Sequence, residues 1–288
     1  MLVKAHAKIN LLLDVADTRP DGYHELTTVM QTLSLCDDVS LEPAPEISLT
    51  VEGADLTAGQ DNLAWRAAEL LRQLTGFRGG AAIRLIKRIP LAAGLAGGSA
   101  DAAAVLLGLN KMWQLGLGMH DLSLLGAKLG SDVSFCLWGG TALCRGRGEL
   151  VTPLPALPPA GVLLVRPPFG VSTADVYRRY DALPGPVRQD SRRMLTAVKN
   201  MDLSGVARNL GNSLERVTTA MHSEIGLIKD AIAAAGAAGV LMSGSGPTVF
   251  GLFPDPQSAV RAAVRIKNDR YWVLATAFLA QNNLSVVK

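Results

Sequence analysis

Residues 90–100 form a run of very small residues, Pro-Leu-Ala-Ala-Gly-Leu-Ala-Gly-Gly-Ser-Ala, between a predicted strand and a predicted helix. Small side chains let backbone N–H groups approach an anion, and the N-terminus of the following helix adds about half a positive charge. This pattern is typical of a polyphosphate site, in which Ser99 would bind a phosphate oxygen or its Mg²⁺. The alternative is a tight strand-to-helix turn filled with alanine.

Two other loop motifs fit this segment poorly. A Walker loop needs a lysine after its last glycine, whereas Gly98 is followed by Ser99 and Ala100. The serine-hydrolase elbow Gly-x-Ser-x-Gly is nearly matched, but Asp101 stands where the closing glycine belongs. A serine hydrolase is therefore a weak rival to a phosphate-binding enzyme.

Lys8 and Asp132 are a possible catalytic pair from distant parts of the chain. Taken alone, Lys8 is a solvent-facing lysine on an alternating segment, and Asp132 is the N-cap of a helix after Gly130 and Ser131. Together they would do more, because a lysine favours the ionised form of a nearby carboxylate, and that carboxylate can orient or deprotonate an attacking hydroxyl. Sequence spacing alone does not bring them together.

The elements that position these residues begin with a strand over residues 3–15. Apolar residues occupy its odd positions, while Lys8 and Asn10 lie on the other side, so the pattern predicts one buried and one polar face. A helix over residues 62–74 is expected to be capped by Asp61 and closed by Gly76. The other elements expected in this half are strands near 39–41, 47–51, 81–89 and 138–144 and helices at 99–113 and 122–129.

Prolines crowd residues 153–159, as is typical of a linker. Beyond them the expected order, apart from inserted helices, is β-α-β-β-α-β, the split pattern of a ferredoxin-like domain. Its elements are a strand at 161–166, helical sequence from 173 to 236, strands at 240–242 and 248–253, a helix at 257–267 and a strand at 272–278. We therefore expect an α+β protein with two domains, residues 1–153 and 154–288.

The composition is that of an ordinary globular enzyme. Of the 288 residues, 49% are hydrophobic and 18% charged, and the net charge of +3 comes without a basic stripe, which argues against a nucleic-acid partner. The three cysteines and four histidines lack the spacing of a metal site. No signal peptide and no apolar stretch of about 20 residues is recognisable, so we expect a cytoplasmic protein without a membrane span.

Three segments, in chain order, resemble the motifs of the GHMP kinases (galactose, homoserine, mevalonate and phosphomevalonate kinases). Residues 5–11 (Ala-His-Ala-Lys-Ile-Asn-Leu) are similar to the first motif, residues 90–100 to the second and residues 243–247 (Ser-Gly-Ser-Gly-Pro) to the third. Residues 19–24 and 129–133 resemble the members that act on a cytidine-diphosphate-linked alcohol of the non-mevalonate isoprenoid pathway. The similarity covers essentially the whole chain.

This resemblance implies an N-terminal domain like domain 2 of ribosomal protein S5, a C-terminal ferredoxin-like domain, and ATP with Mg²⁺ as cofactors. Lys8 and Asp132 match the catalytic pair. The nucleotide would bind Asn62, Leu63 and Lys87 around the adenine and Pro90, Leu91, Ala92, Ala93, Gly94, Leu95, Ala96, Gly97, Gly98, Ser99 and Ala100 around the phosphates. The acceptor would contact Asn10, Tyr23, His24, Tyr177, Gly244, Ser245 and Gly246.

Each implied role has a structural alternative. Tyr23 and His24 follow an Asp-Gly turn and could simply cover a loop, Tyr177 could belong to the core of an amphipathic helix, and the glycines near 245 could only shape a hairpin. Three alanines replace possible glycines of the family pattern, namely Ala92, Ala93 and Ala96. At the level of the whole protein, the rivals are another GHMP kinase of homoserine or mevalonate type and a non-catalytic, S5-like nucleic-acid-binding protein.

Overall fold

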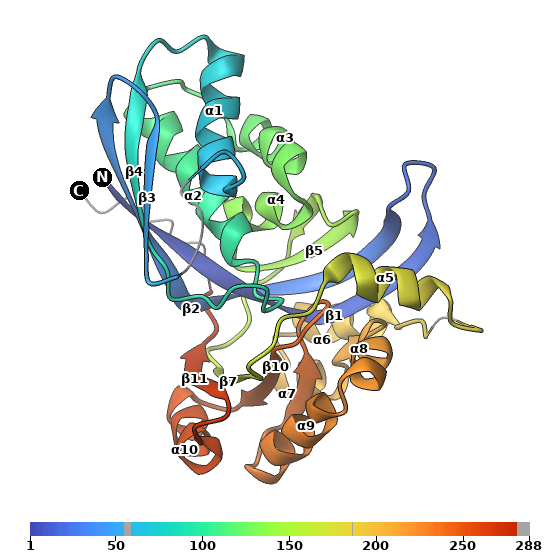
Figure 1. Cartoon of the computed structure of the whole chain (residues 1–288). Coiled ribbons are helices and arrows are strands. Elements are labelled where there is room, and N and C mark those ends of the chain that lie inside the picture. The colour runs from blue at the N-terminus through green and yellow to red at the C-terminus, as the bar shows by residue number, and fades with distance from the viewer. Residues whose placement is uncertain (55–58, 186, 281–288) are drawn as a thin grey trace.

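A large mixed sheet carries the N-terminal half of the chain (Figure 1). The computed structural model describes residues 1–54, 59–185 and 187–280, and within them this sheet has seven strands in the order β3-β4-β2-β1-β8, with β5 paired to β2 and β6 paired to β5. Its last strand comes from the C-terminal half, so both halves contribute to it. The strands are β1 (Leu2–Thr18), β2 (His24–Ala44), β3 (Ser48–Glu52), β4 (Gly80–Ile86), β5 (Thr141–Gly146), β6 (Leu150–Pro153) and β8 (Gly211–Asn212).

A smaller sheet lies in the C-terminal half. Among the described residues it has four strands in the order β11-β7-β10-β9, and all neighbours are antiparallel. With α9 and α10 in the connections, this is the expected ferredoxin-like order. The elements are β7 (Gly161–Arg166), α9 (Glu224–Ala234), β9 (Gly239–Met242), β10 (Val249–Phe253), α10 (Pro256–Ile266) and β11 (Trp272–Ala277).

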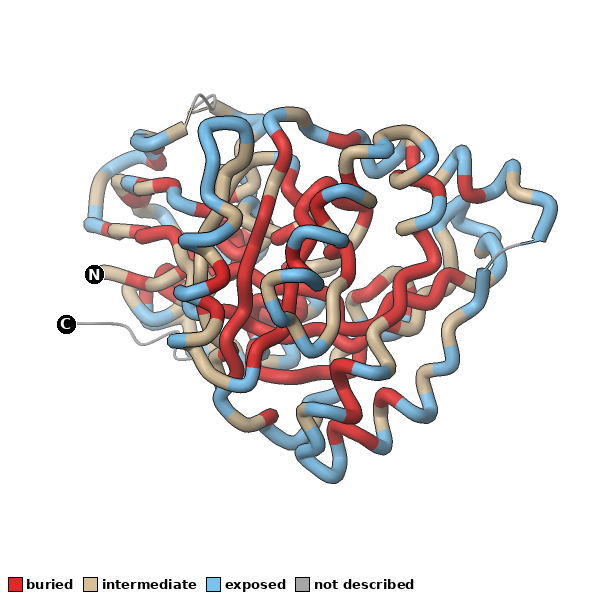
Figure 2. Tube along the Cα trace, turned by 90° about the horizontal axis from the view of Figure 1, so that it is seen from below, coloured by how far each residue is buried: buried red, intermediate tan, exposed pale blue. Residues whose placement is uncertain are grey.

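The two sheets share a hydrophobic core. Side chains from one face of β7 and β10, such as Leu164 and Phe250, pack with Ile9 and Leu11 of β1. Figure 2 shows buried segments running through the middle of the molecule, with exposed segments around them. The other face of the smaller sheet is covered by α9 and α10. The long hairpin of β1 and β2 is therefore held between the two halves.

Lys8 and Asn10 of β1 are buried, which corrects the expectation of a solvent-facing Lys8. The pairing of β1 with β2 shifts register between His6 and Lys8. Before the shift, Val3 and Ala5 pack with the N-terminal helices, whereas afterwards Ile9 belongs to the core shared with the smaller sheet. A bulge of this kind turns the following residues to the other face. Lys8 consequently lies on the side of the helices, with only 4% of its surface exposed.

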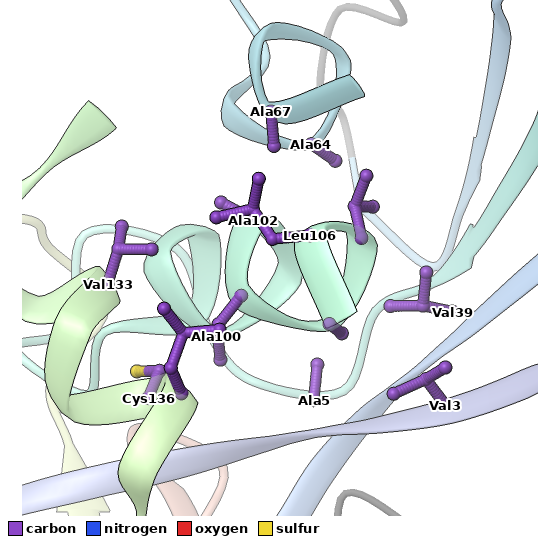
Figure 3. Close-up of a cluster of buried hydrophobic side chains, with 14 of the residues drawn as sticks. Val3, Ala5, Val39, Ala64, Ala67, Ala100, Ala102, Leu106, Val133 and Cys136 are labelled. Atoms are coloured by element: carbon purple, nitrogen blue, oxygen red, sulfur yellow. The ribbon is translucent and has the colours of Figure 1, made fainter. Parts of the chain in front are cut away.

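Helix α2 (Gly97–Met112) lies at the centre of the N-terminal half (Figure 3). Its alanines combine high helix propensity with a small cross-section, which lets neighbouring backbones approach closely. Ala102 faces Ala64 and Ala67 of α1, and Ala100 lies near Cys136 of α4. The helices of this layer are α1 (Leu63–Thr75), α2, α3 (Met119–Leu129) and α4 (Ser131–Trp138).

Two local predictions were wrong, and one short strand was missed. Asn62 rather than Asp61 caps α1, because its side chain accepts a hydrogen bond from the Ala64 N–H at 2.9 Å. The strand expected at residues 138–144 begins later, because Trp138 is the last residue of α4 and β5 starts at Thr141. The two-residue strand β8 was missed because it is too short to show a pattern.

The remaining helices are α5 (Thr173–Asp181), α6 (Ser191–Lys199), α7 (Leu203–Arg208) and α8 (Glu215–Met221).

Candidate active site

A cleft of about 1040 Å³ lies where the N-terminal helices, the β1–β2 hairpin and the C-terminal half meet. Its walls come from these elements, from the loop at residues 90–96, from α5 and from the loop at residues 244–246. The predicted site residues that line it are Lys8, Asn10, Tyr23, His24, Leu63, Pro90, Leu91, Ala92, Ala93, Gly94, Ala96, Gly97, Gly98, Ser99, Asp132, Tyr177, Gly244, Ser245 and Gly246. The fold thus gathers most of the predicted site from distant segments of the chain.

The N-terminus of α2 opens into this cleft at Gly97, Gly98 and Ser99. The N-cap is Ala96, so no side chain caps the helix. The first N–H groups of a helix have no intrahelical partner, and here they are left to other acceptors. This end of α2 offers hydrogen-bond donors and the positive end of the helix dipole to an anion.

The loop before α2 is held by buried residues and has unusual backbone angles. Leu95 and Ala100 do not line the cleft, because Leu95 is buried in the core between the sheets and Ala100 in the core around α2. Two of the alanines that replace possible glycines have left-handed backbones, with φ of 48° at Ala92 and 58° at Ala96. Such a backbone costs an alanine about 1–2 kcal/mol, so the surrounding contacts must hold the loop in shape.

One of those contacts joins this loop to the second glycine-rich loop. The Ser243 hydroxyl donates a hydrogen bond to the Gly94 carbonyl oxygen at 2.9 Å. A Cβ at Gly94 would lie 2.3 Å from the Ser243 carbonyl oxygen, so only glycine permits this approach. In the same loop, Gly244 is so close to β1 that its Cβ would lie 3.4 Å from Asn10 Oδ1. The two loops therefore meet beside the first strand.

Lys8 connects these parts. Its Nζ lies 3.3 Å from Asp132 Oδ2, and it donates hydrogen bonds to Asn10 Oδ1 at 2.8 Å and to the Gly94 carbonyl oxygen at 3.3 Å. Asp132 lies in the first turn of α4, where the helix dipole favours a carboxylate, and 30% of its side chain is exposed to the cleft. The predicted pair is thus in contact, with the lysine buried and the carboxylate open to a ligand.

Thr28 fixes the orientation of Asn10 and was not predicted. Its hydroxyl donates to the Leu12 carbonyl oxygen at 2.6 Å and accepts from Asn10 Nδ2 at 2.9 Å. The amide nitrogen of Asn10 is thereby directed at β2 and its oxygen at Lys8. The signal in the sequence is weak, because Thr28 lies in an ordinary β-branched stretch of β2.

Another part of the cleft, the aromatic end, is lined by Tyr23, His24 and Tyr177. The ring of His24 lies 5.0 Å from that of Tyr177, and its Nε2 is 2.6 Å from Asp181 Oδ1. Tyr23 is 54% exposed, and the Arg147 guanidinium lies 4.9 Å from the centre of its ring. Burial raises the pKa of Tyr177, with Asp132 adding to the effect. Sequence reasoning missed Arg147 and Asp181, although Asp181 follows Tyr177 by one helical turn.

Two residues predicted to surround adenine lie outside the cleft lining. Asn62 caps α1, beside Leu63, which does line the cleft. Lys87 is buried beneath the loop, where its ammonium donates hydrogen bonds to Asp37 and Asp101. Burial lowers the pKa of Lys87, but the two carboxylates outweigh it and leave the pKa raised.

Asp37 extends this buried cluster into the backbone. Its Oδ1 accepts hydrogen bonds from the N–H groups of Arg88 and Ile89, the latter at 2.8 Å. Asp37 belongs to β2, Lys87 follows β4, and Asp101 lies just past the first turn of α2. The cluster therefore joins three elements directly under the entrance to the anion-binding loop.

Comparison with known proteins identifies the class. The family description "GHMP kinases N terminal domain" matches residues 62–140, and "GHMP kinases C terminal" matches residues 194–271. The chain belongs to the GHMP kinase family and is accordingly an ATP-dependent phosphotransferase. No helix among the described residues is long and apolar enough to cross a membrane.

Within that family, the chain is most plainly similar to 4-diphosphocytidyl-2-C-methyl-D-erythritol kinases. The enzyme of that name from Pelotomaculum thermopropionicum is 53% identical over 94% of this chain and 96% of its own length. The one from Geobacillus thermodenitrificans is 51% identical over 87% of each.

Solved structures of GHMP kinases are similar to this chain as well. A 4-(cytidine 5'-diphospho)-2C-methyl-D-erythritol kinase of 39% identity superposes with a TM-score of 0.81, covering 97% of this chain and 100% of its own. Homoserine kinase from Cytophaga hutchinsonii, at 21% identity, has a TM-score of 0.77 over 98% and 95% and shares the fold alone. The expected GHMP kinase fold is confirmed.

Proposed function

We propose that this kinase transfers the γ-phosphoryl group of ATP to the tertiary 2-hydroxyl of 4-diphosphocytidyl-2-C-methyl-D-erythritol, a step in isoprenoid precursor synthesis. Relatives named for this kinase are about half identical over most of the chain. The observation that carries the proposal is one cleft that joins the open end of α2, the Lys8–Asp132 pair and an aromatic end at Tyr23, His24 and Tyr177.

The nucleotide would bind at the α2 end of the cleft. Its phosphates would accept hydrogen bonds from the N–H groups at Gly97, Gly98 and Ser99, with the rest of residues 90–100 shaping the loop. Adenine would lie near Leu63, beside the capped start of α1 at Asn62. For Lys87, whose ammonium binds two carboxylates, we propose a supporting role beneath the nucleotide site.

A Mg²⁺ ion would accompany the phosphates. Among the described residues, no group of three or more His, Cys, Asp or Glu side chains could hold a metal on its own. Mg²⁺ in phosphotransferases usually binds through few protein oxygens together with water and substrate phosphates, and the Ser99 hydroxyl in the cleft suits that donor set. When bound, the ion neutralises charge on the transferring phosphoryl group.

Asp132 and Lys8 would act at the point of transfer. Asp132 would accept a hydrogen bond from the 2-hydroxyl, orienting its oxygen toward the γ-phosphorus and taking its proton as the new P–O bond forms and ADP leaves. The Lys8 ammonium, held by Asn10 and Gly94, would stabilise the negative charge that develops between acceptor and phosphate. Asn10 would also lie against the acceptor end of the substrate.

The cytidine end of the substrate would occupy the aromatic end of the cleft. Stacking on Tyr23 and Tyr177, with a hydrogen bond to His24, is what recognition of a pyrimidine requires. The glycine-rich loop would approach the diphosphate or the erythritol moiety through Gly244, Ser245 and Gly246, and the Ser245 hydroxyl is already 2.9 Å from that of Thr173. Small aliphatic alcohols such as homoserine and mevalonate offer no ring to this end.

The test is ADP release with ATP and Mg²⁺ in the presence of the cytidyl substrate, homoserine or mevalonate. We expect turnover with the cytidyl substrate alone. Preferential turnover of homoserine or mevalonate would favour another GHMP kinase activity, and no turnover of any acceptor would favour the non-catalytic alternative.

We further propose that the functional division of the chain falls between residues 153 and 154 and that the enzyme is cytoplasmic.

A further inference from the structure

A carboxylate holds the imidazole of His24 at the aromatic end of the cleft. Nε2 of His24 lies 2.6 Å from Oδ1 of Asp181, which belongs to the last turn of α5. The His24 side chain is 9% exposed, while that of Asp181 is 49% exposed. Both residues line the cleft, and so does Tyr177, one helical turn before Asp181. The contact therefore joins β2 to α5 across the site where the base would lie.

The chemistry of this contact determines where the imidazole carries its hydrogen. An ionised carboxylate only accepts hydrogen bonds, so the atom that faces it, Nε2, must be the donor. In a neutral imidazole the other nitrogen, Nδ1, is then an acceptor. Asp181 thus selects one of the two tautomers of the neutral His24 imidazole.

We propose that Asp181 is the specificity-determining residue that makes the cleft prefer a cytosine base over a uracil base. The proposal rests on the proposed function, because it concerns the base of that substrate. Cytosine presents an amino group that donates to an acceptor such as Nδ1 of His24, whereas uracil presents a carbonyl oxygen at the same position. Uracil would place two acceptors against each other, and a polar group left without a partner weakens binding.

Other groups near His24 do not supply this selection. Tyr177 and Tyr180 contact the imidazole through their rings, with centroids 5.0 and 6.4 Å away, and the Tyr180 hydroxyl donates to the Val15 carbonyl oxygen. Arg147 lies over Tyr23 and donates to the Ala127 carbonyl oxygen. The hydrogen bond with Asp181 is therefore the contact that distinguishes the two ring nitrogens.

Two variants of Asp181 test the proposal. In Asp181→Asn, the amide can either donate to Nε2 or accept from it, so neither tautomer is imposed. In Asp181→Ala, neither tautomer is favoured. We expect the ratio of kcat/KM for the cytidyl substrate to that for its uridyl analogue to fall by about tenfold or more in both variants. The preference for CDP over UDP in direct binding, measured by calorimetry, should fall in the same way.

Asp175→Asn is the matched control. Asp175 lies on the same helix but does not line the cleft, and it pairs with Arg178 and Arg179, so its substitution should leave the base preference unchanged. Equal base preference in wild type and both folded Asp181 variants would overturn the proposal. So would wild-type protein that binds CDP and UDP equally, whichever acceptor it phosphorylates. A wild type that prefers CDP yet phosphorylates a different alcohol would instead contradict the proposed function and leave the role of Asp181 standing.

Discussion

The ammonium of Lys8 lies 3.3 Å from the carboxylate of Asp132, joining the first strand to the first turn of α4. Neither local sequence alone predicts that the two residues meet. Lys8 reaches the helix side of the sheet through the register shift after His6, and Asp132 enters the cleft because Gly130 separates α3 from α4. The contact therefore depends on the whole N-terminal half being folded.

Asp132→Asn is expected to reduce kcat by about 10²–10⁴-fold, the usual contribution of a positioned proton acceptor. Asparagine keeps the size and hydrogen-bonding capacity of the side chain, and Asp132 is not the cap of α4, so the thermal unfolding midpoint should stay close to that of wild type. Single-turnover kinetics with saturating ATP would measure the effect on chemistry. A folded variant with near-normal turnover would remove Asp132 from the catalytic pair.

Gly98→Val is expected to raise KM for ATP by about tenfold or more without loss of stability. A Cβ at Gly98 meets only Leu63, at an ordinary 3.5 Å, so the added side chain would occupy the cleft beside the open end of α2. Nucleotide titration of the folded variant measures this. Normal ATP affinity would return the loop to a purely structural role.

Gly97→Val is the informative partner variant. Its Cβ would lie 3.0 Å from Ile89 Cγ2 and 3.4 Å from the Lys87 ammonium, so it points beneath the loop and not into the cleft. We expect it to lower the free energy of unfolding by about 1–3 kcal/mol through overpacking. Urea denaturation distinguishes this effect from the loss of ATP affinity in Gly98→Val.

Most of the regular structure was predictable from the sequence because it is periodic or bracketed by turn residues. The alternation in β1, the glycine that closes α1 and the β-α-β-β-α-β order of the C-terminal half all have local causes. The boundary between α4 and β5 was not predictable, because the apolar run at residues 133–138 carries no period.

The site was predictable only in part, for a related reason. Residues in the glycine-rich loops are recognisable by type, but Thr28, Asp37, Arg147 and Asp181 act through single contacts with residues far away in the sequence. The left-handed backbones of Ala92 and Ala96 were likewise not predictable from the sequence, since alanine normally avoids that conformation.

Lys87→Met tests the buried cluster under the loop. The variant would leave the carboxylates of Asp37 and Asp101 buried without a cation, so it should lower the free energy of unfolding by about 3–5 kcal/mol. Lys4→Met is the control, because Lys4 pairs with Asp38 near the surface and should cost about 1 kcal/mol or less. Normal stability with a raised KM for ATP would instead indicate that Lys87 contacts the nucleotide directly.

The pH dependence of stability should report on Asp101 in the same cluster. Burial raises the pKa of Asp101, and Lys87 opposes the rise only in part. The folded protein therefore holds this proton more tightly than the unfolded chain does. Its contribution to stability is complete below about pH 4 and is lost as the pH rises through the raised pKa.

Asp101→Asn mimics the protonated acid and should remove this contribution to the pH dependence. Between about pH 5 and 8, its free energy of unfolding should decline less than that of wild type. Urea denaturation at several pH values measures both curves. Parallel curves for the two proteins would show that Asp101 does not carry the proton.

Tyr23→Ala is expected to raise KM for the cytidyl substrate by about tenfold or more. Tyr23 is an exposed aromatic residue that lines the cleft together with His24 and Tyr177. A base stacked on an aromatic ring contributes roughly 1–3 kcal/mol, which corresponds to a factor of about ten or more in affinity. KM for ATP should change little, because the nucleotide phosphates would bind at the other end of the cleft.

Tyr23→Phe is the matched control, since it keeps the ring and removes only the hydroxyl, and its kinetics should stay near those of wild type. Both KM values would be measured for wild type and the two variants by ADP release. An effect of Tyr23→Ala confined to ATP, or an equal effect in Tyr23→Phe, would contradict stacking of the base on Tyr23. The kinase activity and the roles of Lys8 and Asp132 would survive that result, because these two residues would act at the point of phosphoryl transfer and not on the base.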